Sequence, residues 1–415
     1  MSTKFRIVFS LWFLALVNYL DRVAISFAGP SIMDSLSISP AQFGVVLSSF
    51  GVGYALALIP GGMISDRWGA RAVLVVGPLF WALFTGMTGL VTTTLAFVIV
   101  RVCFGFSEGI FSPSIYKVVG DNFEPKSRAG ILAIVLSALA LGPALAGPMV
   151  GTLVSQFSWQ VMFLCMTVPA LLASMLAHFL IPKHGAASVA DAIATDPETL
   201  DEQSVTFFEV LKRPSLWLVS LSNLCTDIAQ WGFLGWMPTY LALERQIDLK
   251  HAGMIGSIPY IAAFFGLLAG GGVGSSTWLH RLRAQVVVVC YLAGGLSLFL
   301  AYNATTLFWA VAGLSATAFF MFGALAPKGA VVIALAPERH RAAYVGTYSV
   351  AGQIGGASAP AVIGFMVSAS GSFATGFALM TASLCIAGVC MLALIPMMKR
   401  DRSTEARLEN VAPGS

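Results

Sequence analysis

Long apolar runs separated by short polar segments make up most of the sequence. Twelve runs are long enough to cross a bilayer, which takes about 20 mostly apolar residues. None alternates between apolar and polar positions as a strand would, so each predicts a transmembrane helix. The runs are residues 7–29, 41–63, 72–92, 95–118, 129–155, 160–181, 215–242, 252–273, 284–302, 305–335, 342–369 and 373–398.

Composition agrees with this pattern. Of the 415 residues, 57% are hydrophobic and only 10% are charged, whereas soluble proteins average about 25% charged residues. The chain is therefore expected to be an integral membrane protein. The first run follows Lys4 and Arg6 like a signal peptide, but it is long and contains Asp21-Arg22, so it is expected to be the first span.

Other classes of site are not indicated. The six cysteines are scattered through apolar runs without CxxC spacing or histidine partners, so we expect no metal site and no disulfide. No basic stripe with interleaved aromatics points to nucleic acid. No nucleophile–base pair or phosphate loop points to an enzyme, and no cofactor is expected.

The positions of Lys and Arg predict the orientation. With the N-terminus inside, seventeen of the 23 fall in cytoplasmic segments and only Arg245 and Lys250 fall in external loops. Both termini are therefore expected in the cytoplasm. The predicted organisation is a six-helix bundle at 1–182, a cytoplasmic linker at 183–212, a second six-helix bundle at 213–398 and a cytoplasmic tail at 399–415, in a monomer.

The two halves resemble each other. "EPKSRAG" (124–130) precedes the fifth span and "PERHRAA" (337–343) precedes the eleventh, with glycines at matching offsets behind them. Gly44 and Gly62 correspond to Gly253 and Gly271. A repeat of six spans predicts two bundles around a central site, which is typical of secondary transporters.

Several motifs resemble those of a known family. "GGMISDRWGAR" (61–71) resembles the cytoplasmic loop signature of the major facilitator superfamily, and "LGPALAGPMVG" (141–151) resembles the Gly/Pro motif of its fifth span. "NYLDR" (18–22), "RVCFGFSEG" (101–109) and "WMPTYL" (236–241) are similar to the anion:cation symporter family. That resemblance implies twelve helices and transport of organic anions, such as sugar acids and aromatic carboxylates, usually with protons. The second copy of the loop signature departs from the pattern, because Ser275 stands where Asp66 stands in the first.

Four ionisable residues lie inside the first and fourth spans. Asp21 and Arg22 are neighbours, while Arg101 and Glu108 are two helical turns apart and therefore share a face. Each costs roughly 2.5–3.5 kcal/mol to bury in a span. Arginine offers a planar fork that matches carboxylate, so Arg22 and Arg101 are candidates for holding a substrate carboxylate.

The two acids are candidates for proton coupling. Burial and a neighbouring arginine shift the pKa of a carboxyl in opposite directions, so Asp21 and Glu108 could exchange protons near physiological pH. The family resemblance implies the same roles. The alternative is two ion pairs that only brace the first bundle. Lys117 and Lys328, also inside spans, are expected to extend their ammonium groups to the cytoplasmic interface.

Further candidates come from aligning the halves and from the resemblance. An offset of 209 residues places Asn18, Asp21 and Arg22 opposite Asp227, Gln230 and Trp231. Asp227 is interpreted as a hydroxyl acceptor, a second proton site or a partner of Asn223. The resemblance implies that Tyr54 helps to bind the anion. The full candidate set for substrate binding is Arg22, Arg101, Tyr54, Tyr19, Asn18, Asp227, Gln230, Trp231 and Gln353. For most of the uncharged members, helix packing is an equal alternative.

The sequence predicts a proton-coupled symporter for a small organic anion, in the bacterial inner membrane. Asp66, Arg67 and Arg71 would hold an inward gate closed by ion pairs. Alternatives are a proton-driven efflux antiporter and a non-transporting membrane sensor. Sodium coupling, the identity of the anion and the direction of transport stay open.

Overall fold

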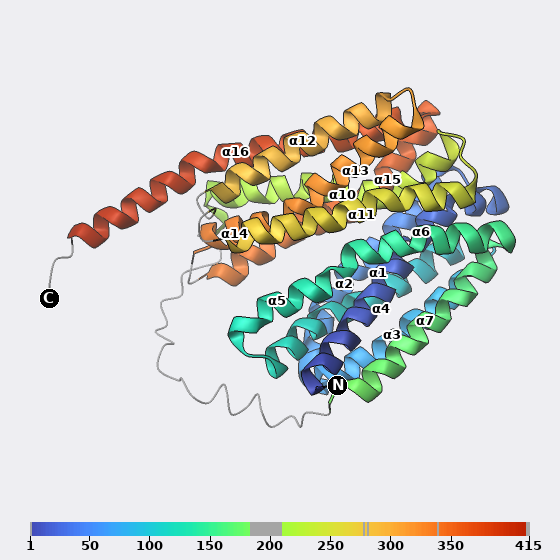
Figure 1. The fold of residues 1–415 in the computed structure, drawn as a ribbon, viewed down its shortest axis with the longest axis horizontal. Helices are drawn as coiled ribbons and strands as arrows, with labels where there is room; N and C mark the ends of the chain where they lie inside the picture. The colour runs from blue at the N-terminus through green and yellow to red at the C-terminus, as the bar shows by residue number, and fades with distance from the viewer. Residues whose placement is uncertain (1, 183–209, 277–278, 280–281, 338–339, 412–415) are drawn as a thin grey trace. The chain divides into compact units, whose positions relative to one another are not determined.

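The elements of the described residues are α-helices (Figure 1). The computed structural model describes residues 2–182, 210–276, 279, 282–337 and 340–411. The helices are α1 Thr3–Leu36, α2 Pro40–Trp68, α3 Ala70–Thr88, α4 Thr94–Asn122, α5 Pro125–Leu136, α6 Ala138–Gln156, α7 Trp159–Leu180, α10 Pro214–Leu243, α11 Leu249–Ser275, α12 Arg283–Asn303, α13 Leu307–Gly323, α14 Leu325–Leu335, α15 Arg341–Ser370 and α16 Ala374–Val411.

The helices match the predicted spans. Eleven helical stretches of the described chain are long and apolar enough to cross a membrane, and two of them combine α5 with α6 and α13 with α14. The twelfth predicted span, 215–242, corresponds to α10, which is 30 residues long but carries Asn223, Asp227 and Gln230 and is less apolar. The all-helical fold is therefore confirmed. Most of the predicted linker, residues 183–209, lies outside the described residues.

Helix boundaries follow from capping residues. Ser39 forms a capping box with Gln42, and Pro40 occupies the first position of α2, where its missing N–H costs nothing. Ser2, Thr93, Ser158 and Thr306 cap α1, α4, α7 and α13 with their side-chain oxygens. These caps satisfy backbone N–H groups that have no partner within the helix.

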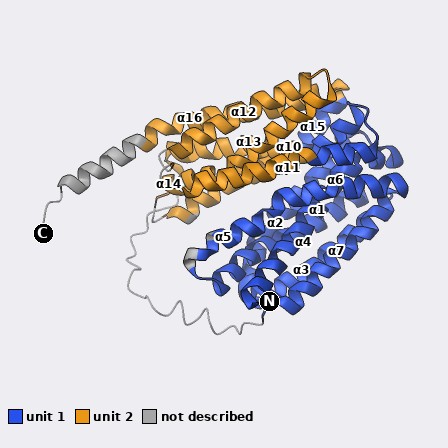
Figure 2. Cartoon of the chain, viewed as in Figure 1, with its two compact units in different colours: residues 1–205, 235–257, 360–368 blue, residues 206–234, 258–359, 369–415 orange. Residues whose placement is uncertain are grey.

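The chain forms two compact units (Figure 2). Unit 1 contains residues 1–205, 235–257 and 360–368, and unit 2 contains 206–234, 258–359 and 369–415. Unit 1 thus holds the first-half helices together with parts of α10, α11 and α15. The division into bundles 1–182 and 213–398 stays a prediction.

Close contact between α2 and α4 is the packing feature that positions the charged residues of unit 1. A Cβ at Gly105 would overlap the backbone oxygen of Phe50, and one at Gly53 would overlap the oxygen of Val102. The backbones can approach this closely only because both positions lack side chains. Phe50 therefore lies directly beside the part of α4 that carries Arg101 and Glu108.

Second-half segments inside unit 1 are bonded to first-half helices. Thr239 Oγ1 on α10 donates to Ser26 O on α1 at 3.0 Å. The backbone N–H of Ala361 on α15 donates to Ser48 Oγ on α2 at 2.9 Å. Ser26 and Ser48 lie in the halves of α1 and α2 that are next to the loop joining these helices. This loop lies on the predicted external side.

Candidate functional site

A buried ion pair joins α1 to α4 in unit 1. Arg22 Nη2 and Nε donate to Glu108 Oε2 at 2.9 and 3.1 Å. The Glu108 side chain is fully buried and that of Arg22 is 14% exposed. A second bond runs from Arg22 Nη2 to Asn18 Oδ1 at 3.2 Å, one turn back on α1. The structure therefore brings together three residues that the sequence predicted for the site.

Aromatic rings surround the Arg22 guanidinium. Its Cζ lies 4.9 Å from each of the ring centroids of Tyr19, Phe50 and Tyr54. Tyr54 also bonds Ser112 on α4, with 2.8 Å between the hydroxyl oxygens. The rings restrict the guanidinium to a narrow range of orientations and stabilise its charge. Tyr19 and Tyr54, both predicted from the sequence, therefore contact the cation directly.

Arg101, within α4, shares the ring of Phe50 with Arg22. Its Cζ is 4.6 Å from the ring centroid of Phe104 and 5.3 Å from that of Phe50. Only 2% of the residue is exposed, and its Nε has no hydrogen-bond partner among the described residues. Arg101 interacts electrostatically with Glu108 and Asp21. It is thus a buried cation with an unused hydrogen-bond donor.

Asp21 bonds a residue that sequence reasoning missed. Thr85 Oγ1 on α3 donates to Asp21 Oδ2 at 2.6 Å, while Oδ1 has no partner in the described chain. Asp21 is 1% exposed and interacts electrostatically with Glu108 and Arg101. Only the fold could reveal Thr85, because it lies on α3, 64 residues from Asp21 in sequence.

The four charged side chains form one cluster, named here the α1–α4 charge cluster (Asp21, Arg22, Arg101 and Glu108). Arg22 forms an ion pair with a carboxylate, whereas Arg101 contacts rings and forms no ion pair among the described residues. Loss of the Glu108 charge would release the Arg22 guanidinium for another carboxylate. The cluster can therefore exchange an internal anion for an external one, which is the chemistry that an anion site coupled to protons requires.

The predicted gate residues make contacts within the first half of the chain. Asp66 Oδ1 pairs with Lys117 Nζ at 2.6 Å, and the Asp66 side chain is 76% exposed. Arg71 donates to backbone oxygens of α7, from Nη2 to His178 at 2.6 Å and from Nε to Ile181 at 2.7 Å. Arg67 is exposed at the end of α2. A gating role for the three residues stays a prediction.

Unit 2 contains the remaining candidates. Asp227 and Gln230 are partly buried on α10, and Gln353 is partly buried on α15 with an unbonded, buried Oε1. A Cβ at Gly356 would lie 2.8 Å from the indole nitrogen of Trp231. Trp231 therefore packs closely against α15.

Lys328 differs from the sequence expectation. It was expected to extend toward the interface, but it is 5% exposed. Its Nζ donates to Asn223 Oδ1 at 2.9 Å and to Thr226 Oγ1 at 3.3 Å. Lys328 lies about two turns before α14 ends at Leu335. Its ammonium does not extend to the interface because α10 provides hydrogen-bond acceptors inside the unit.

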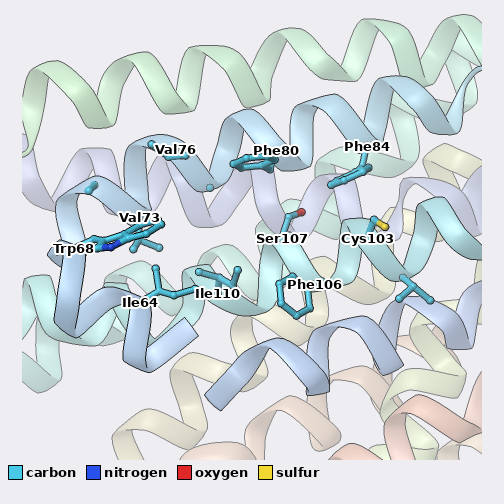
Figure 3. Close-up of a pocket in the computed structure, with 13 residues that line it drawn as sticks. Ile64, Trp68, Val73, Val76, Phe80, Phe84, Cys103, Phe106, Ser107 and Ile110 are labelled. Carbon is cyan, nitrogen blue, oxygen red and sulfur yellow. The ribbon is translucent and has the colours of Figure 1, made fainter. Parts of the chain in front are cut away.

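A separate cavity of about 480 Å³ is lined by α3, α4 and the C-terminal end of α2 (Figure 3). Its lining is apolar and includes Trp68, Phe80, Phe84 and Phe106. None of the charged candidates lines it, so it is not the site of the predicted chemistry.

Comparisons with known proteins identify the sequence family. The chain matches the profile of the Major Facilitator Superfamily over residues 11–327 and 275–413. It is 29% identical over 411 residues to the hexuronate transporter of Bacillus subtilis (strain 168), covering 97% of both chains. It is 29% identical over 431 residues to the probable galactarate/D-glucarate transporter GarP of Escherichia coli (strain K12), covering 96% of both.

A solved structure has the same fold. The crystal structure of a bacterial homolog of the human lysosomal transporter Spinster, in an inward-facing and occupied conformation, superposes with a TM-score of 0.74. The two chains are 18% identical, with 96% of this chain and 97% of the other covered. The helices described above therefore have the arrangement of a known transporter fold.

Proposed function

The chain belongs to the major facilitator superfamily, and from that premise we propose that it is a proton-coupled symporter that takes up a sugar acid or a related small organic anion by alternating access. It is a multi-pass membrane transporter and not an enzyme. The relatives named as transporters of hexuronate, galactarate and glucarate support sugar acids as the substrate class. Those relatives are bacterial, which supports the bacterial inner membrane as its location.

The observation that carries the proposal is the ion pair between Arg22 and Glu108. Its carboxylate is fully buried and accepts two bonds from one guanidinium. Such a pair is costly to break by removing one partner, about 3–5 kcal/mol. If Glu108 takes up a proton while a substrate carboxylate binds Arg22, the ion pair is replaced and no buried charge is left without a partner. Proton binding and anion binding therefore favour each other.

Asp21 and Arg101 extend the same scheme. Arg101 interacts electrostatically with Glu108 and Asp21, so protons on both acids leave Arg101 free to attract the anion. Asn18, Tyr19 and Tyr54 orient the guanidinium of Arg22. In the proposed cycle, protonation and substrate binding neutralise the cluster, the two halves rock, and proton loss to the cytoplasm restores the ion pair and releases the substrate.

Topology and gating complete the proposal. Both termini and residues 183–212 are placed in the cytoplasm on the basis of the Lys and Arg distribution, with bundles at 1–182 and 213–398 in a monomer. The bonds that join α10 and α15 to α1 and α2 then close the external side. Asp66, Arg67 and Arg71 would close the cytoplasmic side in the opposite state.

Uptake into liposomes containing the purified protein tests this function. Labelled galacturonate should accumulate when the outside is acidic, and a protonophore should abolish the accumulation. Arg22→Ala should lose uptake at every pH. Accumulation driven by a sodium gradient at equal pH, with none driven by a proton gradient, would contradict proton coupling.

A further inference from the structure

Unit 2 buries a lysine among polar side chains from three other helices. Lys328 on α14 donates to Asn223 and Thr226 on α10, and both acceptors are neutral. Its Nζ lies 5.9 Å from the Tyr348 ring on α15, and it interacts electrostatically with Tyr291 on α12. An ionisable group inside a membrane span is costly and is retained where it has a task.

Asp227 is an acid on the same helix as the two residues that Lys328 bonds. It lies one turn from Asn223 on α10 and interacts electrostatically with Lys328. A Cβ at Gly352 would overlap Asp227 Oδ2 and Asn223 Nδ2, so the carboxylate lies against the backbone of α15. No hydrogen bond to Asp227 is present among the described residues. A carboxylate has about four acceptor positions, and here they are unused.

A second unused acceptor lies on the same helix pair. Gln353 follows Gly352 on α15, and its buried Oε1 has no hydrogen-bond partner in the described chain. Buried polar groups are normally bonded, and exceptions call for an explanation such as a ligand. Asp227 and Gln353 together thus offer acceptors for several hydroxyl donors at the α10–α15 contact.

We propose that Lys328 is a positioning residue that holds the turn of α10 carrying Asp227 through its bonds to Asn223 and Thr226, and that Asp227 and Gln353 recognise the hydroxyl groups of a sugar acid. The inference rests on the proposed function and assigns substrate selectivity to unit 2. A fixed carboxylate accepts hydrogen bonds but donates none, so it discriminates strongly against an analogue that lacks hydroxyls.

Competition against labelled galacturonate uptake tests this inference. The competitors are unlabelled galacturonate and cyclohexanecarboxylate, which has one carboxylate on a six-membered ring and no hydroxyls. The variants are Lys328→Met, Asp227→Asn and the double variant. The double variant removes one positive and one negative charge, so it keeps the charge balance if a single change prevents folding. Lys328→Arg keeps the charge and should keep much of the preference. The matched control is Tyr302→Phe, which removes one bond to Ser372 elsewhere in unit 2.

The wild type should prefer galacturonate, and this preference should be about tenfold smaller in the double variant. The reason is that a hydrogen bond to a charged group is stronger than one to a neutral group by about that factor in affinity. The pH profile of uptake should stay unchanged in the double variant. An unchanged preference would overturn the inference, and a flattened pH profile would make Asp227 a proton site instead. If the wild type takes up neither carboxylate, the proposed function itself is wrong.

Discussion

Neutralising Glu108 should separate anion binding from proton coupling. Glu108→Gln mimics the protonated acid, which is the state that the proposed cycle requires for substrate binding. In the wild type an ionised Glu108 competes with the substrate for Arg22, so anion affinity should fall as pH rises. In the variant this competition is permanently reduced, so the affinity should depend on pH less steeply than in the wild type, with only the contribution of Asp21 left.

The size of the effect follows from the ion pair. Glu108 Oε2 accepts two bonds from Arg22, at 2.9 and 3.1 Å, with no exposure of the carboxylate to solvent. A hydrogen bond to a charged group contributes about 1.5–3 kcal/mol. Glutamine retains a neutral acceptor, so part of the interaction with Arg22 remains. We therefore estimate the change in binding free energy as that of one such hydrogen bond. Anion affinity should then rise about ten- to hundredfold at a pH where the wild-type Glu108 is ionised.

Binding and transport should respond in opposite directions. Galacturonate binding is measured by calorimetry at pH 5.5 and pH 8, and exchange and proton-driven accumulation are measured in liposomes. The variant should bind tightly at both pH values and exchange substrate, but it should not accumulate it. Ser107→Ala is the matched control, because the Ser107 hydroxyl donates only within α4, to Phe104 O. Wild-type pH dependence of binding in Glu108→Gln would refute the competition between Glu108 and substrate.

Three further predictions concern single contacts. Arg101→Lys should lose most uptake measured in liposomes, because an ammonium lacks the planar fork that binds carboxylate and stacks on rings. Gly105→Ala should lower the melting temperature in detergent, since its Cβ would overlap a backbone oxygen of α2, whereas Gly77→Ala, where nothing lies within 4 Å, should raise it slightly. Asp66→Asn breaks an exposed pair with Lys117 and should change the unfolding free energy by less than about 1 kcal/mol. A larger loss of stability would contradict the assignment of Asp66 to gating rather than to folding.

The hydrophobic pattern was sufficient to predict the helices. Runs of apolar residues determine where a chain can cross lipid, and the polar residues of α10 did not hide its span because its length and flanks remained typical. Position within a span was less informative. Lys328 was expected at an interface because it lies near the cytoplasmic end of the tenth span. Its acceptors Asn223 and Thr226 lie on α10, more than 100 residues away in sequence, so the sequence could not reveal them.

The charged residues were identifiable from sequence, but their partners were not. An acid or arginine inside an apolar run is conspicuous, so Asp21, Arg22, Arg101 and Glu108 could all be named. Adjacent residues on a helix point about 100° apart, so adjacency could not reveal that Arg22 bonds Glu108. That pairing depends on the close approach of α2 and α4 and on the register of α1. Thr85 was missed for the same reason.

Proton movement during substrate uptake tests the central claim most directly. Liposomes containing the protein and an internal pH-sensitive dye are exposed to galacturonate at equal pH without sodium. The account predicts internal acidification that follows galacturonate entry in the wild type and is absent in Asp21→Asn and Glu108→Gln. Uptake of galacturonate without acidification, or acidification that persists when both acids are neutralised, would contradict it.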